Sequence, residues 1–143
     1  MPDFARSTHP AVQAQLDRLE KLSPAGDRLG LERISALLDR LGRPQDRLPP
    51  VFHVAGTNGK GSTCALLRAA LEASGHTVHL FTSPHLVRFN ERIRISGRLI
   101  GDESLSALLT EVLDHSAGIE PSFFEVAAAV AFLAFAQIGR AHV

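Results

Sequence analysis

A glycine-rich stretch behind a short apolar run constrains the fold of this chain more than any other feature. The stretch Gly56-Thr57-Asn58-Gly59-Lys60-Gly61-Ser62-Thr63 follows the apolar run Val51–Ala55 and precedes a segment with apolar residues at helical spacing. Strand, glycine loop and helix in this order are typical of a phosphate cradle, because backbone N–H groups and the helix dipole face the anion. Glycines let the backbone approach closely, and Lys60 adds a full positive charge. An ordinary strand-to-helix turn is the alternative, which three glycines and a lysine in this context disfavour.

The stretch is a variant of the general nucleotide-binding loop. The pattern G-x-x-x-x-G-K-[ST] would need a glycine at Val54 and a hydroxyl directly after Lys60. Here Gly61 is inserted before Ser62 and Thr63. The loop therefore predicts phosphate binding, but by itself it does not select one class of nucleotide enzyme.

The first half of the chain has the periodicities of an α/β unit. Apolar residues at helical spacing predict helices over 9–22, 31–41 and 64–74. The apolar runs 51–55 and 77–81 are typical of buried strands in a parallel sheet. Together with the helix between them, these strands form a βαβ unit with a right-handed crossover.

The second half predicts one loop, one short strand and two helices. Residues 82–92 have no clean period and are expected to form an ordered loop, whereas 93–95 alternate as a strand does. Asp102 is expected to cap a helix that runs to 115. The segment 122–136 is apolar nearly all round, so we expect a buried helix. The predicted class is α/β, with a P-loop-type parallel sheet flanked by helices.

Composition and charge exclude some functions. The chain has 143 residues, 45% of them hydrophobic, with 15 basic and 15 acidic side chains and a formal net charge of zero. This balance argues against nucleic-acid or membrane-surface binding driven by bulk charge. The single cysteine, Cys64, suits a reducing compartment, and Met1–His9 lacks the apolar core of a signal peptide. No apolar run reaches membrane-spanning length, so we expect a cytoplasmic protein.

A candidate metal ligand follows the second predicted strand. Open α/β sheets bind ligands at the carboxyl ends of their strands, where Ser83 would face phosphates held by Lys60. A neutral hydroxyl is an acceptable Mg²⁺ ligand. From spacing alone, a serine that opens a proline turn is the alternative. His53, inside the first apolar run, is expected to be a core histidine with satisfied hydrogen bonds.

Three stretches together resemble a known family. Residues 56–62, the run Thr-Ser-Pro-His-Leu-Val-Arg-Phe-Asn-Glu-Arg at 82–92, and Ser-Phe-Phe-Glu at 122–125 resemble the N-terminal part of bacterial folylpolyglutamate synthase/dihydrofolate synthase, of the Mur ligase superfamily. The resemblance covers roughly residues 16–136, including the segment 27–33. The loop alone would indicate only a Mur-type ligase, whereas the stretch at 82–92 is specific to the folate enzymes.

The resemblance implies an ATP-dependent ligase that adds L-glutamate to dihydropteroate or to a folate. ATP would phosphorylate the substrate carboxylate, and the glutamate amine would attack the acyl phosphate. The implied cofactors are ATP and Mg²⁺, and the implied partners are small molecules, with no nucleic acid and no membrane. The parent protein is expected to be a monomer.

The resemblance also assigns roles to individual residues. ATP phosphates would be held by Gly56, Thr57, Asn58, Gly59, Lys60, Gly61 and Ser62, with Lys60 in the catalytic role. The pterin or folate would be contacted by Asp27, Arg28, Leu29, Ser122, Phe123, Phe124 and Glu125. His85, which follows Pro84 in the stretch that resembles the folate enzymes' substrate loop, is a further candidate contact. Ser83 matches the Mg²⁺ ligand of the family. Ser122 and Glu125 also have the spacing of a capping box at the start of the last helix.

The resemblance further implies that important parts are absent. Residues 1–136 correspond to the N-terminal part of the ATP-binding domain, while further Mg²⁺ ligands, a carbamylated lysine and the C-terminal glutamate-ligase domain would lie beyond Ala136. Residues 137–143 depart from the family and resemble a translated sequencing adapter, so we expect this tail not to be native. We also expect the chain alone to be inactive, with the apolar faces of the helix 122–136 exposed.

Two other functions stay open at this point. A Mur-type ligase that adds an amino acid to a peptidoglycan precursor would share the phosphate loop but not the stretch at 82–92. A free-standing nucleotide-binding module would need no further domain. The sequence does not distinguish a dihydrofolate synthase from a folylpolyglutamate synthase or an enzyme with both activities.

Overall fold

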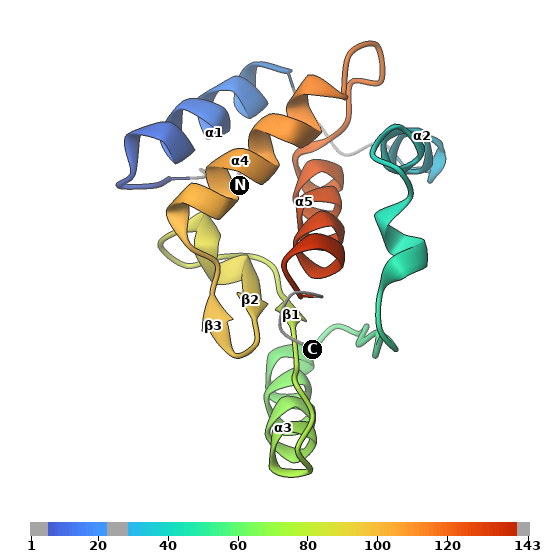
Figure 1. Cartoon of the computed structure of the whole chain (residues 1–143), viewed down its shortest axis with the longest axis vertical. Coiled ribbons are helices and arrows are strands. Elements are labelled where there is room, and N and C mark those ends of the chain that lie inside the picture. The colour runs from blue at the N-terminus through green and yellow to red at the C-terminus, as the bar shows by residue number, and fades with distance from the viewer. Residues whose placement is uncertain (1–5, 23–28, 140–143) are drawn as a thin grey trace.

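The computed structural model of the chain describes residues 6–22 and 29–139, and it is rich in helix (Figure 1). The helices are α1 (Pro10–Leu22), α2 (Glu32–Arg40), α3 (Lys60–Ala73), α4 (Asp102–Asp114) and α5 (Phe123–Gln137), with the 3₁₀ turns η1 (Pro44–Arg47) and η2 (Phe89–Arg92). The strands are β1 (Leu80–Phe81), β2 (Ile93–Ile95) and β3 (Arg98–Leu99). None of the helices described is long and apolar enough to cross a membrane.

Helix α5 forms the centre of the core. It contacts α4, α2, η1 and β2, and most of its side chains are buried. Alanine and valine fill much of its surface, so neighbouring elements approach from several sides. The prediction of a buried helix here is confirmed, whereas the expectation that its apolar faces would be exposed is wrong.

The start of α5 has the predicted capping box. The Ser122 hydroxyl accepts the backbone N–H of Glu125 at 3.2 Å, and a Glu125 carboxylate oxygen accepts the backbone N–H of Ser122 at 2.9 Å. The two bonds satisfy donors that every helix start leaves free. They also fix the direction in which the chain enters the core.

Helices α1 and α4 pack against each other beside α5. Buried leucines and valines at helical spacing form the seam, including Leu16 and Leu19 of α1 and Leu109 and Val112 of α4. The predicted helices over 9–22, 31–41 and 102–115 are confirmed, with bounds that differ by one residue. The expected cap of α4 is wrong in detail, because Gly101 occupies the N-cap position without a side-chain bond.

The described strands form a small antiparallel sheet in the order β1-β2-β3. Phe81 pairs with Ile93, and Arg94 pairs with Leu99. The predicted strand over 93–95 is confirmed, whereas the strand predicted over 77–81 is limited to its last two residues. The described strands therefore do not form the expected parallel βαβ unit.

The predicted strand over 51–55 is absent from the part of the chain that the structure describes. Val51 and Phe52 are 68% and 64% exposed, and no strand is assigned there. His53 is exposed, so the prediction of a core histidine is also wrong. A strand is stabilised by hydrogen bonds to a neighbouring strand, and no described strand lies beside this segment.

Helix α3 extends away from the other helices (Figure 1). None of its side chains is buried, and Leu66 is 73% exposed. It ends as predicted, with Ser74 at the C-cap and Gly75 at φ 88°, a conformation that glycine adopts without strain. The structure therefore separates a packed body around α5 from a helix that makes little core contact.

This contrast predicts unequal local stability. Amides in α5 should exchange with deuterium by the slowest, near-global openings, because their helix is buried, whereas amides in α3 should exchange faster. Residue-resolved hydrogen exchange by NMR measures this difference. Equal protection in α3 and α5 would contradict the prediction.

A second prediction concerns the capping box. Replacing Ser122 by alanine removes the acceptor for the N–H of Glu125 and should lower the free energy of unfolding by about 0.5–2 kcal/mol. Urea unfolding followed by far-UV circular dichroism measures the change. Ser104→Ala, on the exposed side of α4, is the control and should have a smaller effect.

Candidate functional site

The phosphate loop, residues 56–62, is exposed and joins the 51–55 segment to α3. Gly56 and Gly59 have φ values of 147° and 71°, which disfavour residues with a side chain. Gly59 is the N-cap residue of α3 in the left-handed conformation. An added Cβ at either glycine, or at Gly61, would meet no atom within 4 Å. The backbone thus presents an open surface to an approaching group.

Lys60 is the first residue of α3, and its side chain folds back over this loop. The Nζ atom donates to the backbone oxygen of Gly56 at 2.5 Å. The ammonium charge therefore lies close to the free N–H groups and positive dipole end of the helix. Glycine backbone, lysine and helix start together form a donor set that fits a phosphate group.

Ser83 lies on the segment that faces the start of α3. The residue before it, Thr82, and the loop residue Gly61 line one hollow, together with Cys64, Arg68 and Leu80. Ser83 itself is exposed. Among the described residues, no group of three or more His, Cys, Asp or Glu side chains is arranged to hold a metal ion. Ser83 therefore offers one oxygen ligand for a cation at this place, not a complete set.

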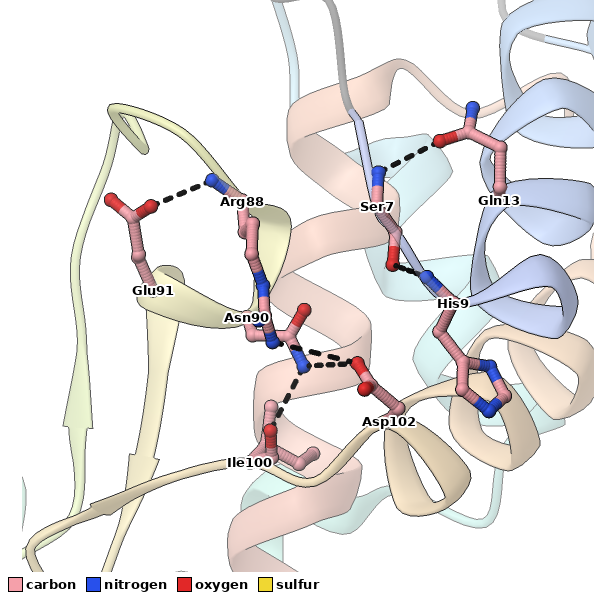
Figure 2. A network of polar contacts seen from close by, with 8 residues as sticks. All are labelled: Ser7, His9, Gln13, Arg88, Asn90, Glu91, Ile100 and Asp102. Carbon is pink, nitrogen blue, oxygen red and sulfur yellow. Dashed lines mark hydrogen bonds and ion pairs between the residues drawn. The ribbon is translucent and has the colours of Figure 1, made fainter.

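The loop 82–92 is tied together by a carboxylate at its end (Figure 2). One oxygen of Glu91 accepts the backbone N–H of Leu86 at 2.9 Å. The other accepts the N–H of Val87 at 2.9 Å and of Arg88 at 2.6 Å. The prediction of an ordered loop is confirmed, and these bonds are one physical reason.

The neighbouring residue, Asn90, fastens η2 to the body of the protein. Its side-chain amide, on a residue 1% exposed, donates to the backbone oxygen of Ile100 at 2.9 Å and to the Asp102 carboxylate at 3.0 Å (Figure 2). Arg88 reaches the same carboxylate at 3.7 Å. The loop is therefore joined to the start of α4.

Arg92 is buried, with 1% of its surface exposed. Its Nε atom donates to Nδ1 of His85 at 2.8 Å. Its guanidinium carbon lies 5.5 Å from the ring centre of Phe89 and 5.2 Å from that of Phe123, within the range of cation–π contacts. Arg92 is therefore a buried cation held by ring faces and a histidine, not a solvated surface arginine.

The segment 122–125 meets this loop through aromatic rings. Phe123 contacts Phe89 edge-on, with ring centres 5.8 Å apart. Phe124, which is 51% exposed, lies with its ring centre 6.2 Å from that of Phe81. Two stretches that the resemblance assigned to the substrate are thus side by side.

Glu125 joins this segment to α2. Arg33 donates to its two carboxylate oxygens, from Nη2 at 2.8 Å and from Nε at 3.1 Å. This bond to Glu125 raises the pKa of the Arg33 guanidinium above its ordinary value. Sequence reasoning missed the pairing, although an acid at the start of an otherwise apolar helix was a signal that it needs a partner.

The predicted segment at 27–29 is described only at its end. Asp27 and Arg28 lie outside the described residues. Leu29 is fully exposed, and the structure records no contact that brings it to the segment 122–125.

Comparison with known proteins identifies the chain's relatives. A dihydrofolate synthase/folylpolyglutamate synthase of Bacillus subtilis is 46% identical over 121 residues, which is 80% of this chain and 28% of the relative. Over the matched residues the chain is homologous to dihydrofolate synthase/folylpolyglutamate synthases. The chain spans less than a third of the length of this relative. No model of a protein family matches the chain.

Solved structures of the family have the same fold over most of the chain. Escherichia coli FolC in complex with DHPP and ADP superposes with a TM-score of 0.82 at 37% identity, over 92% of this chain and 31% of that one. The bifunctional synthase of Yersinia pestis complexed with AMPPNP and Mn ion gives 0.81 at 36% identity, over 92% and 33%. These likenesses confirm the predicted fold class, that of part of a Mur-type ligase.

The geometry of Glu91 predicts how the loop responds to acid. Hydrogen bonds from the backbone of Arg88 and Leu86 lower the pKa of its carboxyl, and Val87 and nearby His85 act in the same direction. Because the pKa of Glu91 is lower in the folded chain, its ionised carboxylate stabilises the fold. This stabilisation is complete above the pKa that glutamate has in the unfolded chain, about 4.3, and is lost as the pH falls through the pKa in the folded chain. The side-chain carboxyl carbon signal of Glu91 should therefore stay constant down to about pH 4.3 and move only below it. An NMR pH titration measures this, and a transition above that value would contradict it.

Proposed function

We propose that the protein containing this chain is an ATP-dependent ligase that adds L-glutamate to dihydropteroate or to a folate. The observation that carries the proposal is the hollow shared by Gly61 and Thr82, which sets the phosphate loop beside the segment with Ser83. Homologous proteins named for this activity, two of them 46% and 40% identical over the matched residues, support it. A Mur-type ligase for peptidoglycan and a free-standing nucleotide module have no comparable support.

On the nucleotide side, residues 56–62 hold the ATP phosphates. Backbone N–H groups at the start of α3 stabilise the charge on the transferred phosphoryl group, and Lys60 adds a full charge. For this, the Lys60 ammonium leaves the Gly56 oxygen and turns toward the phosphates. Ser83 would hold a bound Mg²⁺ through one hydroxyl oxygen, and the ion would neutralise phosphate charge there.

On the substrate side, the exposed ring of Phe124 offers an apolar face to a flat pterin ring. Phe123 and Glu125 support this ring from the protein side. Phe123 packs against Phe89, and Glu125 is held by Arg33. Ser122 caps the start of α5, the turn that carries Phe123, Phe124 and Glu125. His85, held by Arg92, lies with its ring centre 6.0 Å from that of Phe89, the residue that Phe123 contacts. Asp27, Arg28 and Leu29 complete the proposed contacts.

We assign residues 1–136 to the N-terminal part of the ATP-binding domain, and the glutamate site to a further domain of the longer protein. The relatives' greater length supports this division. We further propose that the longer protein is a cytoplasmic monomer that acts on small molecules.

A chimera tests the function. Residues 1–136 of this chain are joined to the remainder of the Bacillus subtilis relative, and glutamate-dependent ADP formation is measured with dihydropteroate and with tetrahydrofolate. The chimera should turn over at least one of them. A rate of ADP formation that is the same with and without glutamate and the pterin substrate would refute the ligase proposal.

Lys60→Ala in this chimera should lower turnover by about 10²–10³-fold, since it removes a positioned charge from the phosphoryl transfer. Lys21→Ala, on the exposed side of α1, is the control and should leave turnover unchanged. Far-UV circular dichroism confirms that both variants fold. Equal turnover in the Lys60 and Lys21 variants would remove the loop from the mechanism.

A further inference from the structure

We propose that Glu91 is a positioning residue, which fixes the backbone of residues 86–88 and thereby helps to hold Ser83 beside the phosphate loop and His85 beside Phe89. The roles of Ser83 and His85 rest on the proposed function. The structural claim about Glu91 rests on the geometry of the loop.

The first observation is that one carboxylate accepts three consecutive backbone N–H groups. The distances from its oxygens to the nitrogens of Leu86, Val87 and Arg88 are 2.9, 2.9 and 2.6 Å. Three successive N–H groups aimed at one anion require a tightly curved backbone. Hydrogen bonds to a charged acceptor are roughly twice as strong as those between neutral groups.

The second observation is that side-chain packing does not hold this part of the loop. Leu86 and Val87 are 91% and 72% exposed, so their side chains bury little apolar surface. Order at these residues therefore depends on their backbone bonds, and those bonds go to Glu91.

The third observation is that Ser83 lies between fixed points. On one side, the N–H of Thr82 donates to the backbone oxygen of Arg92 at 2.9 Å, next to the pairing of β1 with β2. On the other side, Arg92 holds the ring of His85, and Glu91 holds the residue after it. Loss of the Glu91 bonds leaves the second side held by the contact of Arg92 with His85 alone, so Ser83 is less firmly fixed there.

The 3₁₀ turn η2, which carries Glu91, is itself fixed to the body of the protein. Glu91 belongs to η2. Asn90, just before it, bonds to Ile100 and Asp102 (Figure 2). Arg92, just after it, is buried. Three consecutive residues thus have three separate tasks. Asn90 attaches the turn to the body, Glu91 shapes the tip of the loop and Arg92 orients His85.

The substitution Glu91→Gln separates these tasks. A carboxylate is only an acceptor, whereas a glutamine amide carries two N–H donors at one of its two positions. The amide in this variant therefore keeps the bonds to one oxygen at most and faces the other N–H groups with a donor. Glu20→Gln, on the exposed surface of α1, is the matched control.

The test is hydrogen exchange and backbone NMR on the full chain of 143 residues. In Glu91→Gln, protection of the amides of residues 86–88 should fall roughly tenfold or more, and the signals of Ser83 and His85 should shift. The urea midpoint and the protection of α4 and α5 should match the Glu20→Gln control. Unchanged protection at 86–88, or an equal loss throughout α4 and α5, would overturn the positioning role. If Glu91→Gln does not fold, Glu91→Asp, one methylene shorter with its charge retained, must show the same local loss.

A second measurement keeps the two proposals apart. Mn²⁺ added with ADP should broaden the amide signals of Ser83 and His85 in the unaltered chain, and less so in Glu91→Gln. Absence of broadening in the unaltered chain would count against the metal role of Ser83, while exchange at 86–88 still decides the role of Glu91. Equal broadening in both proteins would overturn the proposal that Glu91 positions Ser83.

Discussion

A carboxylate buried at the start of an apolar helix sets the arrangement of the packed body. Glu125 is 8% exposed, and burying a charge is costly unless it is paired and hydrogen-bonded. Its partners are the backbone of Ser122, which starts the helix, and the guanidinium of Arg33 at the first turn of α2. Because these groups must meet, α2 is joined to α5 and the direction of the helix start is fixed. Phe123 and Phe124 then face the 81–92 region.

From that point a series of contacts leads to the phosphate loop. Phe123 packs on Phe89 and under the guanidinium of Arg92, which holds His85. The same loop begins at Thr82, which shares a hollow with Gly61. The proposed pterin side and the proposed phosphate side are therefore linked through one series of contacts. The loop 82–92 and the segment 122–125 are attached to the core through η2 and α5.

The features that the sequence predicts well are those that depend on neighbours along the chain. Helix bounds follow from the 3.6-residue period, and the box of Ser122 and Glu125 follows from a fixed spacing of three. The strand predicted over 51–55 and the core position of His53 fail for the opposite reason. An apolar run becomes a strand only where another strand lies beside it, and local pattern does not supply that neighbour.

The site shows the same division. The phosphate loop, the order of the loop 82–92 and the approach of 122–125 follow from motifs and from the family resemblance. The bond between Arg33 and Glu125 joins residues that are 92 positions apart in the sequence. The burial of Arg92 likewise depends on the tertiary structure. No local sequence pattern encodes either feature. The individual tasks of Asn90, Glu91 and Arg92 become visible only when the turn is seen in three dimensions.

The exposed run Val51–Ala55 has a consequence for how the chain behaves at high concentration. It is short, rich in residues that favour strands, and has no strand partner among the described residues. Such a segment is a template for pairing with the same segment of another copy, which leads to aggregation. Pro49 and Pro50 stand directly before it, and proline cannot donate a ladder hydrogen bond. The two prolines thus act as gatekeepers that confine any such intermolecular strand to a few residues on that side.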